Sequence, residues 1–111
     1  MPKVNLLQQY ANADDTPAVN ADDKTPVYLK QMLIQACLSE SQDNSKKVKK
    51  YSLYRDLKTA KKEISLTSED VVILKEAIMP WPTLVVGQTH EMLEGQYVEP
   101  WTPEYHDQDL P

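Results

Sequence analysis

Residues 66–95 read LTSEDVVILKEAIMPWPTLVVGQTHEMLEG, a stretch that carries start and stop signals for two consecutive helices. Thr67 is followed three positions later by Asp70, so each side chain can bond to the backbone N–H of the other. This is a capping box with Asp in place of the commoner Glu. Pro80 ends the first helix, because the residue before a proline is pushed out of the α region. The pattern predicts a helix over 68–79.

The second half of the stretch predicts a helix over 82–94. Pro82 suits the first helical position, because an N–H at that position would have no hydrogen-bond partner within the helix. Gly95 suits the position just past the helix end, because it adopts the left-handed conformation without strain. In isolation, residues 84–86 also fit a short buried strand, but the apolar residues continue at helical spacing. These are Leu84, Val85, Met92 and Leu93, with Thr89 in the same stripe.

Two further helices are predicted upstream. Thr25 suits the N-cap of a helix and Pro26 suits its first position. Because the run from 27 to 38 is mainly apolar, a helix over 26–38 is expected at the centre of the core. A fourth helix is expected over 52–64. Its apolar residues recur at i, i+4, i+7 and i+11: Leu53, Leu57, Ala60 and Ile64.

The sequence therefore predicts an all-α fold, a small bundle of about four helices near 26–38, 52–64, 68–79 and 82–94 with extended arms at both ends. We expect a helical domain over 25–95, a flexible N-terminal arm over 1–24 and an acidic C-terminal arm over 96–111. The N-terminal arm has too little apolar surface to pack over most of its length. Its first ten residues are either a docking segment, with Val4, Leu7 and Tyr10 on one helical face, or a disordered terminus.

Charge is unevenly distributed along the chain. The net charge of the 111 residues is -5, which argues against nonspecific attraction of the whole molecule to nucleic acid or to an anionic membrane. Yet eight of the twelve basic residues fall within 46–62, against one acid, Asp56. This segment is either a solvated basic face, a surface for an acidic protein arm, or a phosphate-binding surface.

The C-terminal arm combines acids, prolines and regularly spaced aromatic residues. A purely solvating tail seldom carries such aromatics, so the arm either docks on the basic helix of its own chain or binds a partner. The predicted partner-binding residues come from both segments: Arg55, Lys58, Lys61, Lys62, Tyr97, Trp101 and Tyr105.

No residue pattern predicts a catalytic, cofactor-binding or metal site. His90 has no second histidine at i+4, and the only other one, His106, lies in the acidic arm. A single cysteine, Cys37, falls within an apolar run and is expected to be a small buried hydrophobe. No apolar run approaches the roughly 20 residues that a membrane span needs. Without a signal-peptide pattern, the expected location is the cytoplasm of a host cell or a virion.

The chain resembles small proteins of tailed bacteriophages at residues 51–55, 66–71, 85–88 and 92–95. The resemblance rests on helix start and stop signals and implies no activity. Together with the charge pattern, it leads to the expectation of a non-enzymatic interaction protein, either a virion assembly component or a modulator of a host protein. Its partner is another protein or a second copy of the chain. The alternative is a nucleic-acid-binding regulator that uses residues 46–62.

Overall fold

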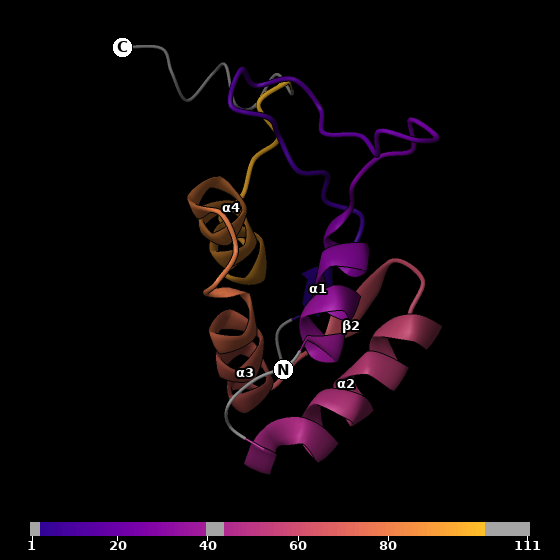
Figure 1. Ribbon diagram of the computed structural model, residues 1–111, viewed down its shortest axis with the longest axis vertical. Helices are drawn as coiled ribbons and strands as arrows, with labels where there is room; N and C mark the ends of the chain where they lie inside the picture. Colours follow the sequence, from indigo (N-terminus) through magenta and orange to yellow (C-terminus); the bar gives the residue numbers. More distant parts are fainter. Residues whose placement is uncertain (1–2, 40–43, 102–111) are drawn as a thin grey trace.

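A computed structural model describes residues 3–39 and 44–101, most of which belong to helices or to the segments that join them (Figure 1). The described residues form four α-helices, a short 3₁₀ helix and a sheet of two strands. In chain order these are β1 (Lys3–Asn5), α1 (Leu29–Leu38), η1 (Asn44–Lys46), α2 (Lys47–Thr59), β2 (Glu63–Ser65), α3 (Ser68–Ile78) and α4 (Thr83–Leu93). The prediction of a helical fold is confirmed, but the prediction of an all-α fold is wrong because of the sheet.

The two helices with local start and stop signals lie where the sequence predicts them. The Thr67 hydroxyl accepts a hydrogen bond from the Asp70 N–H at 3.0 Å, and the Asp70 carboxylate accepts one from the Thr67 N–H at 3.0 Å, so the capping box of α3 is confirmed. Helix α4 begins one residue later than predicted, because Pro82 is its N-cap. Gly95 has a φ of 73°, as its predicted role at the helix end requires.

Helix α1 begins at Leu29, three residues later than the predicted start at Pro26. Its N-cap residue makes no side-chain hydrogen bond. Instead, the Leu29 N–H donates to the Gln8 carbonyl at 2.9 Å and the Lys30 N–H donates to the Leu6 carbonyl at 3.1 Å. Residues 3–28, which we call the N-terminal segment, thus satisfy two backbone donors that would otherwise have no partner at the helix start.

Helix α2 covers 47–59, so the prediction of a helix over 52–64 is displaced by five residues. Leu53 and Leu57 are buried as expected, but Ile64 belongs to β2, where it pairs with Val4 of the antiparallel strand β1. Ile64 is β-branched and suits a strand. Its partner lies sixty residues away in the sequence, and local periodicity carries no information about such a pair.

The N-terminal segment contributes directly to the core. Val4, Leu6 and Tyr10 are buried in the same apolar cluster as residues of all four helices. The backbone here is not helical: β1 ends at Asn5, and Leu6 and Leu7 lie in a turn. Leu6 is fully buried, whereas Leu7, predicted to share a face with Val4 and Tyr10, is 41% exposed. The predicted boundary at residue 25 therefore does not separate the core from the N-terminal segment.

Residues 12–27 contain a tandem repeat that explains how this segment folds. The two copies read NADDTPAV (12–19) and NADDKTPV (20–27). In each copy one aspartate accepts hydrogen bonds from both the backbone N–H and the hydroxyl of the threonine two positions later: Asp14 from Thr16, and Asp23 from Thr25. Thr25 is thereby used in a turn and is not available to cap α1.

The two turns bring three extended segments together. Tyr10 N–H donates to the Val27 carbonyl at 3.0 Å, Val27 N–H to the Ala18 carbonyl at 3.0 Å, and Ala18 N–H to the Tyr10 carbonyl at 2.9 Å. The three bonds form a closed ring. The first copy of the repeat supplies Ala18 and the second supplies Val27. The third residue of the ring, Tyr10, has a side chain that is buried in the core.

Candidate interaction site

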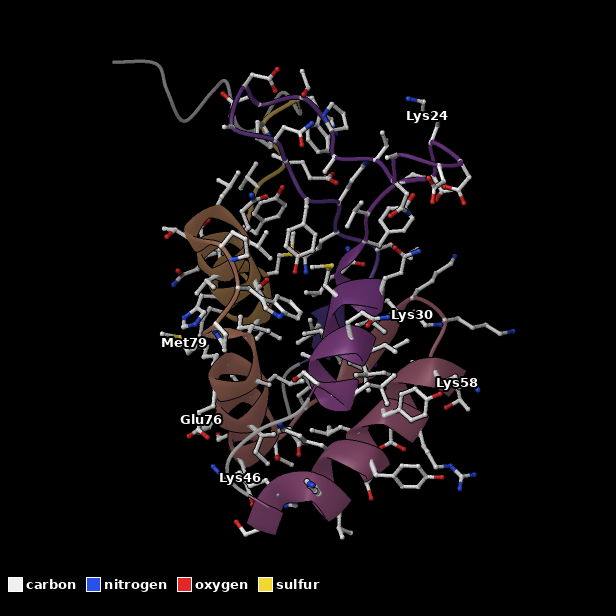
Figure 2. The ribbon with its side chains drawn as sticks, in the orientation of Figure 1. Lys24, Lys30, Lys46, Lys58, Glu76 and Met79 are labelled. Carbon is white, nitrogen blue, oxygen red and sulfur yellow. The ribbon has the colours of Figure 1, made fainter. Side chains whose placement is uncertain are left out.

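The basic segment is divided between two sides of α2. On the side facing α3, Lys46 pairs with Glu76 at 2.7 Å and Lys49 pairs with Glu69 at 2.8 Å (Figure 2). The hydrogen bond that the Lys49 ammonium donates to the Glu69 carboxylate raises the pKa of Lys49. Lys50 is only 6% exposed. These three lysines therefore belong to the contact of α2 with the rest of the molecule.

The opposite side of α2 is exposed and combines apolar and basic side chains. Val48, Tyr51, Arg55 and Lys58 follow one another at i, i+3, i+7 and i+10, which places them along one helical face; we call these four residues the outer face of α2. Val48 is 79% exposed and Tyr51 57%. The Lys58 ammonium lies 5.7 Å from the centre of the Tyr54 ring, and the Tyr51 and Tyr54 rings are 6.2 Å apart.

Lys61 and Lys62 extend the basic surface beyond the end of the helix. Both side chains are exposed in the link between α2 and β2. The Lys62 carbonyl accepts the Leu6 N–H at 2.8 Å, so the link is fixed to the N-terminal segment. The structure thus brings the four predicted basic residues, Arg55, Lys58, Lys61 and Lys62, onto one region of the surface. Within the described part of the chain, none of these four side chains forms an ion pair.

The predicted C-terminal aromatic residues lie elsewhere. Tyr97 donates a hydrogen bond from its hydroxyl to the Gln9 carbonyl at 2.7 Å, and the Gln9 N–H donates to the Glu99 carboxylate at 3.0 Å. Burial raises the pKa of Tyr97, and so do the charges of Glu99 and Glu91. Trp101 is half-buried, and Tyr105 lies outside the described residues.

The start of the C-terminal arm therefore docks on its own chain, but not on the basic helix. Residues 96–101 contact the N-terminal segment at one end of the molecule, whereas α2 lies toward the other end (Figure 1). The structure does not bring the predicted aromatic and basic residues together into one site.

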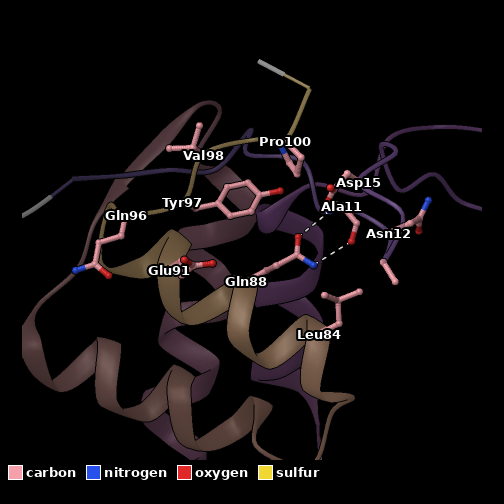
Figure 3. Close-up of a pocket in the computed structure, with 11 residues that line it drawn as sticks. Ala11, Asn12, Asp15, Leu84, Gln88, Glu91, Gln96, Tyr97, Val98 and Pro100 are labelled. Atoms are coloured by element: carbon pink, nitrogen blue, oxygen red, sulfur yellow. Dashed lines mark hydrogen bonds between the residues drawn. The ribbon is translucent and has the colours of Figure 1, made fainter. Parts of the chain in front are cut away.

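A cavity of about 210 Å³ opens beside Tyr97 (Figure 3). At its base Gln88 accepts the Ala11 N–H at 2.7 Å and donates to the Ala11 carbonyl at 2.9 Å. The apolar part of the wall includes Leu84, Tyr97, Val98 and Pro100. Asp15 and Glu91 add two carboxylates, and the lining contains no Lys or Arg.

Next to Gln88, Thr89 joins α4 to the N-terminal segment. Its hydroxyl donates to the Val85 carbonyl at 2.7 Å, so in the 2.5 Å contact with Tyr10 the tyrosine hydroxyl is the donor. Burial raises the pKa of Tyr10 to about 12, against the smaller lowering effect of Thr89. The helical spacing places Thr89 on the buried face of the predicted helix, and Thr89 is buried. Sequence reasoning missed Gln88 as a buried residue and missed the partners of both side chains, because these partners lie more than seventy residues away. The tandem repeat was the available signal that residues 12–27 are structured.

Among the described residues, Cys37 and His90 are the side chains that most often carry chemistry in proteins. Burial raises the pKa of Cys37 to about 11, which disfavours the reactive thiolate near neutral pH. The His90 Nε2 atom is buried without a hydrogen-bond partner within residues 3–39 and 44–101. In the same ranges, His, Cys, Asp and Glu side chains form no group of three or more that could hold a metal ion.

Comparison with known proteins identifies no relative: the chain matches no family model, no curated protein and no solved structure. Of the helices in the described residues, none combines the length and the apolar character needed to cross a membrane.

Proposed function

We propose that the chain is a non-enzymatic interaction module that binds an acidic segment of another protein on the outer face of α2. The observation that carries the proposal is the division of the lysines and arginine between the two sides of the helix. Lys46 and Lys49 are neutralised by acids of α3, whereas Arg55 and Lys58 are exposed to solvent next to exposed apolar side chains.

The apolar side chains favour a protein as the partner. A solvated helix face needs only charged and polar residues, yet Val48 and Tyr51 are more than half exposed. Tyrosine and arginine are enriched among residues that carry binding energy in protein interfaces. An acidic helix or extended segment with an apolar anchor would bury Val48 and Tyr51 while its carboxylates pair with Arg55 and Lys58.

The alternative, a nucleic-acid-binding regulator, is favoured by the two tyrosine rings, which offer stacking surfaces among basic residues. A helix-turn-helix arrangement receives less support, because that motif joins its helices by a turn of about three to four residues. Here residues 60–67, including strand β2, separate α2 from α3. The acids Glu69 and Asp70 in the first turn of α3 would also repel phosphates.

The resemblance to small proteins of tailed bacteriophages supports two settings for such a module. In one it is an assembly component of a virion, and in the other it modulates a host protein. Both settings require the same property, a surface that recognises a protein through charge and exposed apolar side chains.

Fluorescence anisotropy with two labelled probes tests the proposal. One probe is a synthetic peptide of Glu and Asp with two Leu anchors, and the other is a mixed-sequence oligonucleotide of equal charge, tested in single- and double-stranded form near physiological ionic strength. We expect the peptide to bind and Lys58→Glu to weaken binding about tenfold, which corresponds to about 1.4 kcal/mol. The matched control is Lys24→Glu, the same charge reversal on an exposed turn away from α2.

The two probes separate the outcomes. Tighter binding of the oligonucleotide than of the peptide would replace the proposal with the nucleic-acid alternative. Equal loss of peptide binding in Lys24→Glu and Lys58→Glu would show a response to net charge alone, and the outer face of α2 would not be the binding surface.

A further inference from the structure

The cavity beside Tyr97 and the outer face of α2 are complementary in charge. Asp15 and Glu91 place two exposed carboxylates at the cavity, and neither forms an ion pair with another described residue. The charges of Glu99 and Glu91 raise the pKa of Tyr97, so the electrostatic potential at this wall of the cavity is negative. Arg55 and Lys58, the basic members of the outer face, carry positive charges.

The apolar parts of the two surfaces also match. Leu84, at the edge of the cavity, is 46% exposed, and the Tyr97 ring lies in the wall on the other side of Gln88 (Figure 3). Arginine and lysine bury their aliphatic stems against such surface while the charged end group stays near carboxylates. An aromatic wall can add a cation–π contact with the same end group. A basic side chain is therefore the chemical group that this cavity fits best.

The two surfaces lie toward opposite ends of the molecule, whose longest dimension is 47 Å (Figure 1). One chain therefore cannot place its own α2 in its own cavity. We infer that the outer face of α2 of one copy docks at the cavity of a second copy, with Arg55 or Lys58 entering between Asp15 and Glu91. This inference rests on the proposed function and names a second copy of this chain as the acidic partner.

The geometry fixes the kind of assembly. Because different surfaces meet, the interface is head-to-tail, and each added copy leaves one cavity and one α2 face free. Repeated association yields a closed ring or an open filament. The net charge of -5 makes the copies repel one another at long range, so association depends on short-range pairing. Because the paired charges are exposed in the free chain, we expect salt to weaken this pairing more than it relieves the repulsion.

Sedimentation velocity over a concentration series at low and high salt tests this inference with two complementary variants. Asp15→Asn/Glu91→Gln neutralises the cavity and keeps the α2 face; the asparagine also tolerates the φ of 66° at position 15. Arg55→Glu/Lys58→Glu reverses the α2 face and keeps the cavity. The control is Asp22→Asn, which neutralises an exposed acid that does not line the cavity.

We expect the wild-type chain and Asp22→Asn to associate at low salt and each double variant to remain monomeric at the same concentration. An equimolar mixture of the two double variants should give a one-to-one dimer that grows no further, because only one functional pair of surfaces remains. Circular dichroism of each variant confirms that the helices are retained.

Several results would overturn the inference. These are a wild-type chain that stays monomeric at every concentration, a cavity variant that associates like wild type, or a mixture that forms no dimer. Binding of the acidic peptide probe, measured on the same wild-type sample, shows whether the proposed function fails as well. A monomer that binds the peptide on α2 retains the proposed function and loses only the second copy as its partner.

Discussion

At the scale of single residues, Gln9, Tyr10 and Ala11 show how an extended segment can be held in a helical molecule. Every backbone N–H and C=O group of these three residues has a hydrogen-bond partner. The partners are Glu99 and Tyr97 for Gln9, Val27 and Ala18 for Tyr10, and Gln88 for Ala11. Buried backbone groups without partners are costly. The side chains of Glu99, Tyr97 and Gln88, together with the backbone of Val27 and Ala18, therefore substitute for the neighbouring strands that a sheet would provide.

The Tyr10 hydroxyl predicts a loss of stability at alkaline pH. The pKa of Tyr10 rises from 10.0 to about 12 on folding, so the folded state holds this proton more tightly than the unfolded state. The resulting stabilisation is complete below pH 10 and is lost as the pH rises through about 12. Urea denaturation across this range should show a falling midpoint, with phenolate absorbance reporting the ionisation.

Tyr10→Phe is the matched variant for this prediction. It should be less stable than wild type at neutral pH, because the Thr89 hydroxyl loses its donor, but its midpoint should fall less between pH 10 and about 12. A residual fall is expected from Tyr97, whose pKa is also raised. Identical alkaline profiles for the two proteins would contradict the assignment to Tyr10.

The capping box of α3 predicts a second effect at the residue scale. Thr67→Ala removes the acceptor for the Asp70 N–H and should lower the free energy of unfolding by about 1 kcal/mol. Ser68→Ala, a truncation at the next and equally exposed position, should change it by less than about 0.5 kcal/mol. Equal denaturation midpoints for the two variants would mean that the cap contributes no stability.

At the scale of elements, the sequence predicts well where signals are local and poorly where partners are distant. The start of α3 and the ends of α3 and α4 follow from the capping box, Pro80 and Gly95, all within or next to the helices themselves. The start of α1 depends on carbonyls of Leu6 and Gln8, and β2 depends on β1. Single-sequence periodicity cannot reveal these long-range contacts, and this accounts for the errors at α1, α2 and the sheet.

Two adjacent leucines test whether the N-terminal segment is part of the core. Leu6 is fully buried and Leu7 is 41% exposed, so Leu6→Ala should lower the free energy of unfolding by about 2–5 kcal/mol. Leu7→Ala should change it by less than about 0.5 kcal/mol. Denaturant titrations of both variants give the comparison directly. If the segment were an undocked arm, both substitutions would leave the free energy of unfolding unchanged.

At the scale of the whole molecule, the sequence predicts the basic segment but not the use of each lysine in it. The clustering of eight basic residues within 46–62 is visible in the sequence. Which of them face α3 depends on the exact start of α2, five residues before its predicted position. The cavity was equally inaccessible to sequence reasoning, because α4, the first repeat and the C-terminal segment together form its wall.

The central claim is that the outer face of α2 is the binding surface, and a backbone amide chemical-shift map by NMR tests it most directly. The acidic peptide probe is titrated into isotopically labelled protein, at a protein concentration at which the chain is monomeric. We predict progressive shifts confined to residues 47–62, with the largest changes near Tyr51, Arg55 and Lys58. Shifts concentrated at residues 84–101 with α2 unchanged, or no shifts at saturating peptide, would contradict the account.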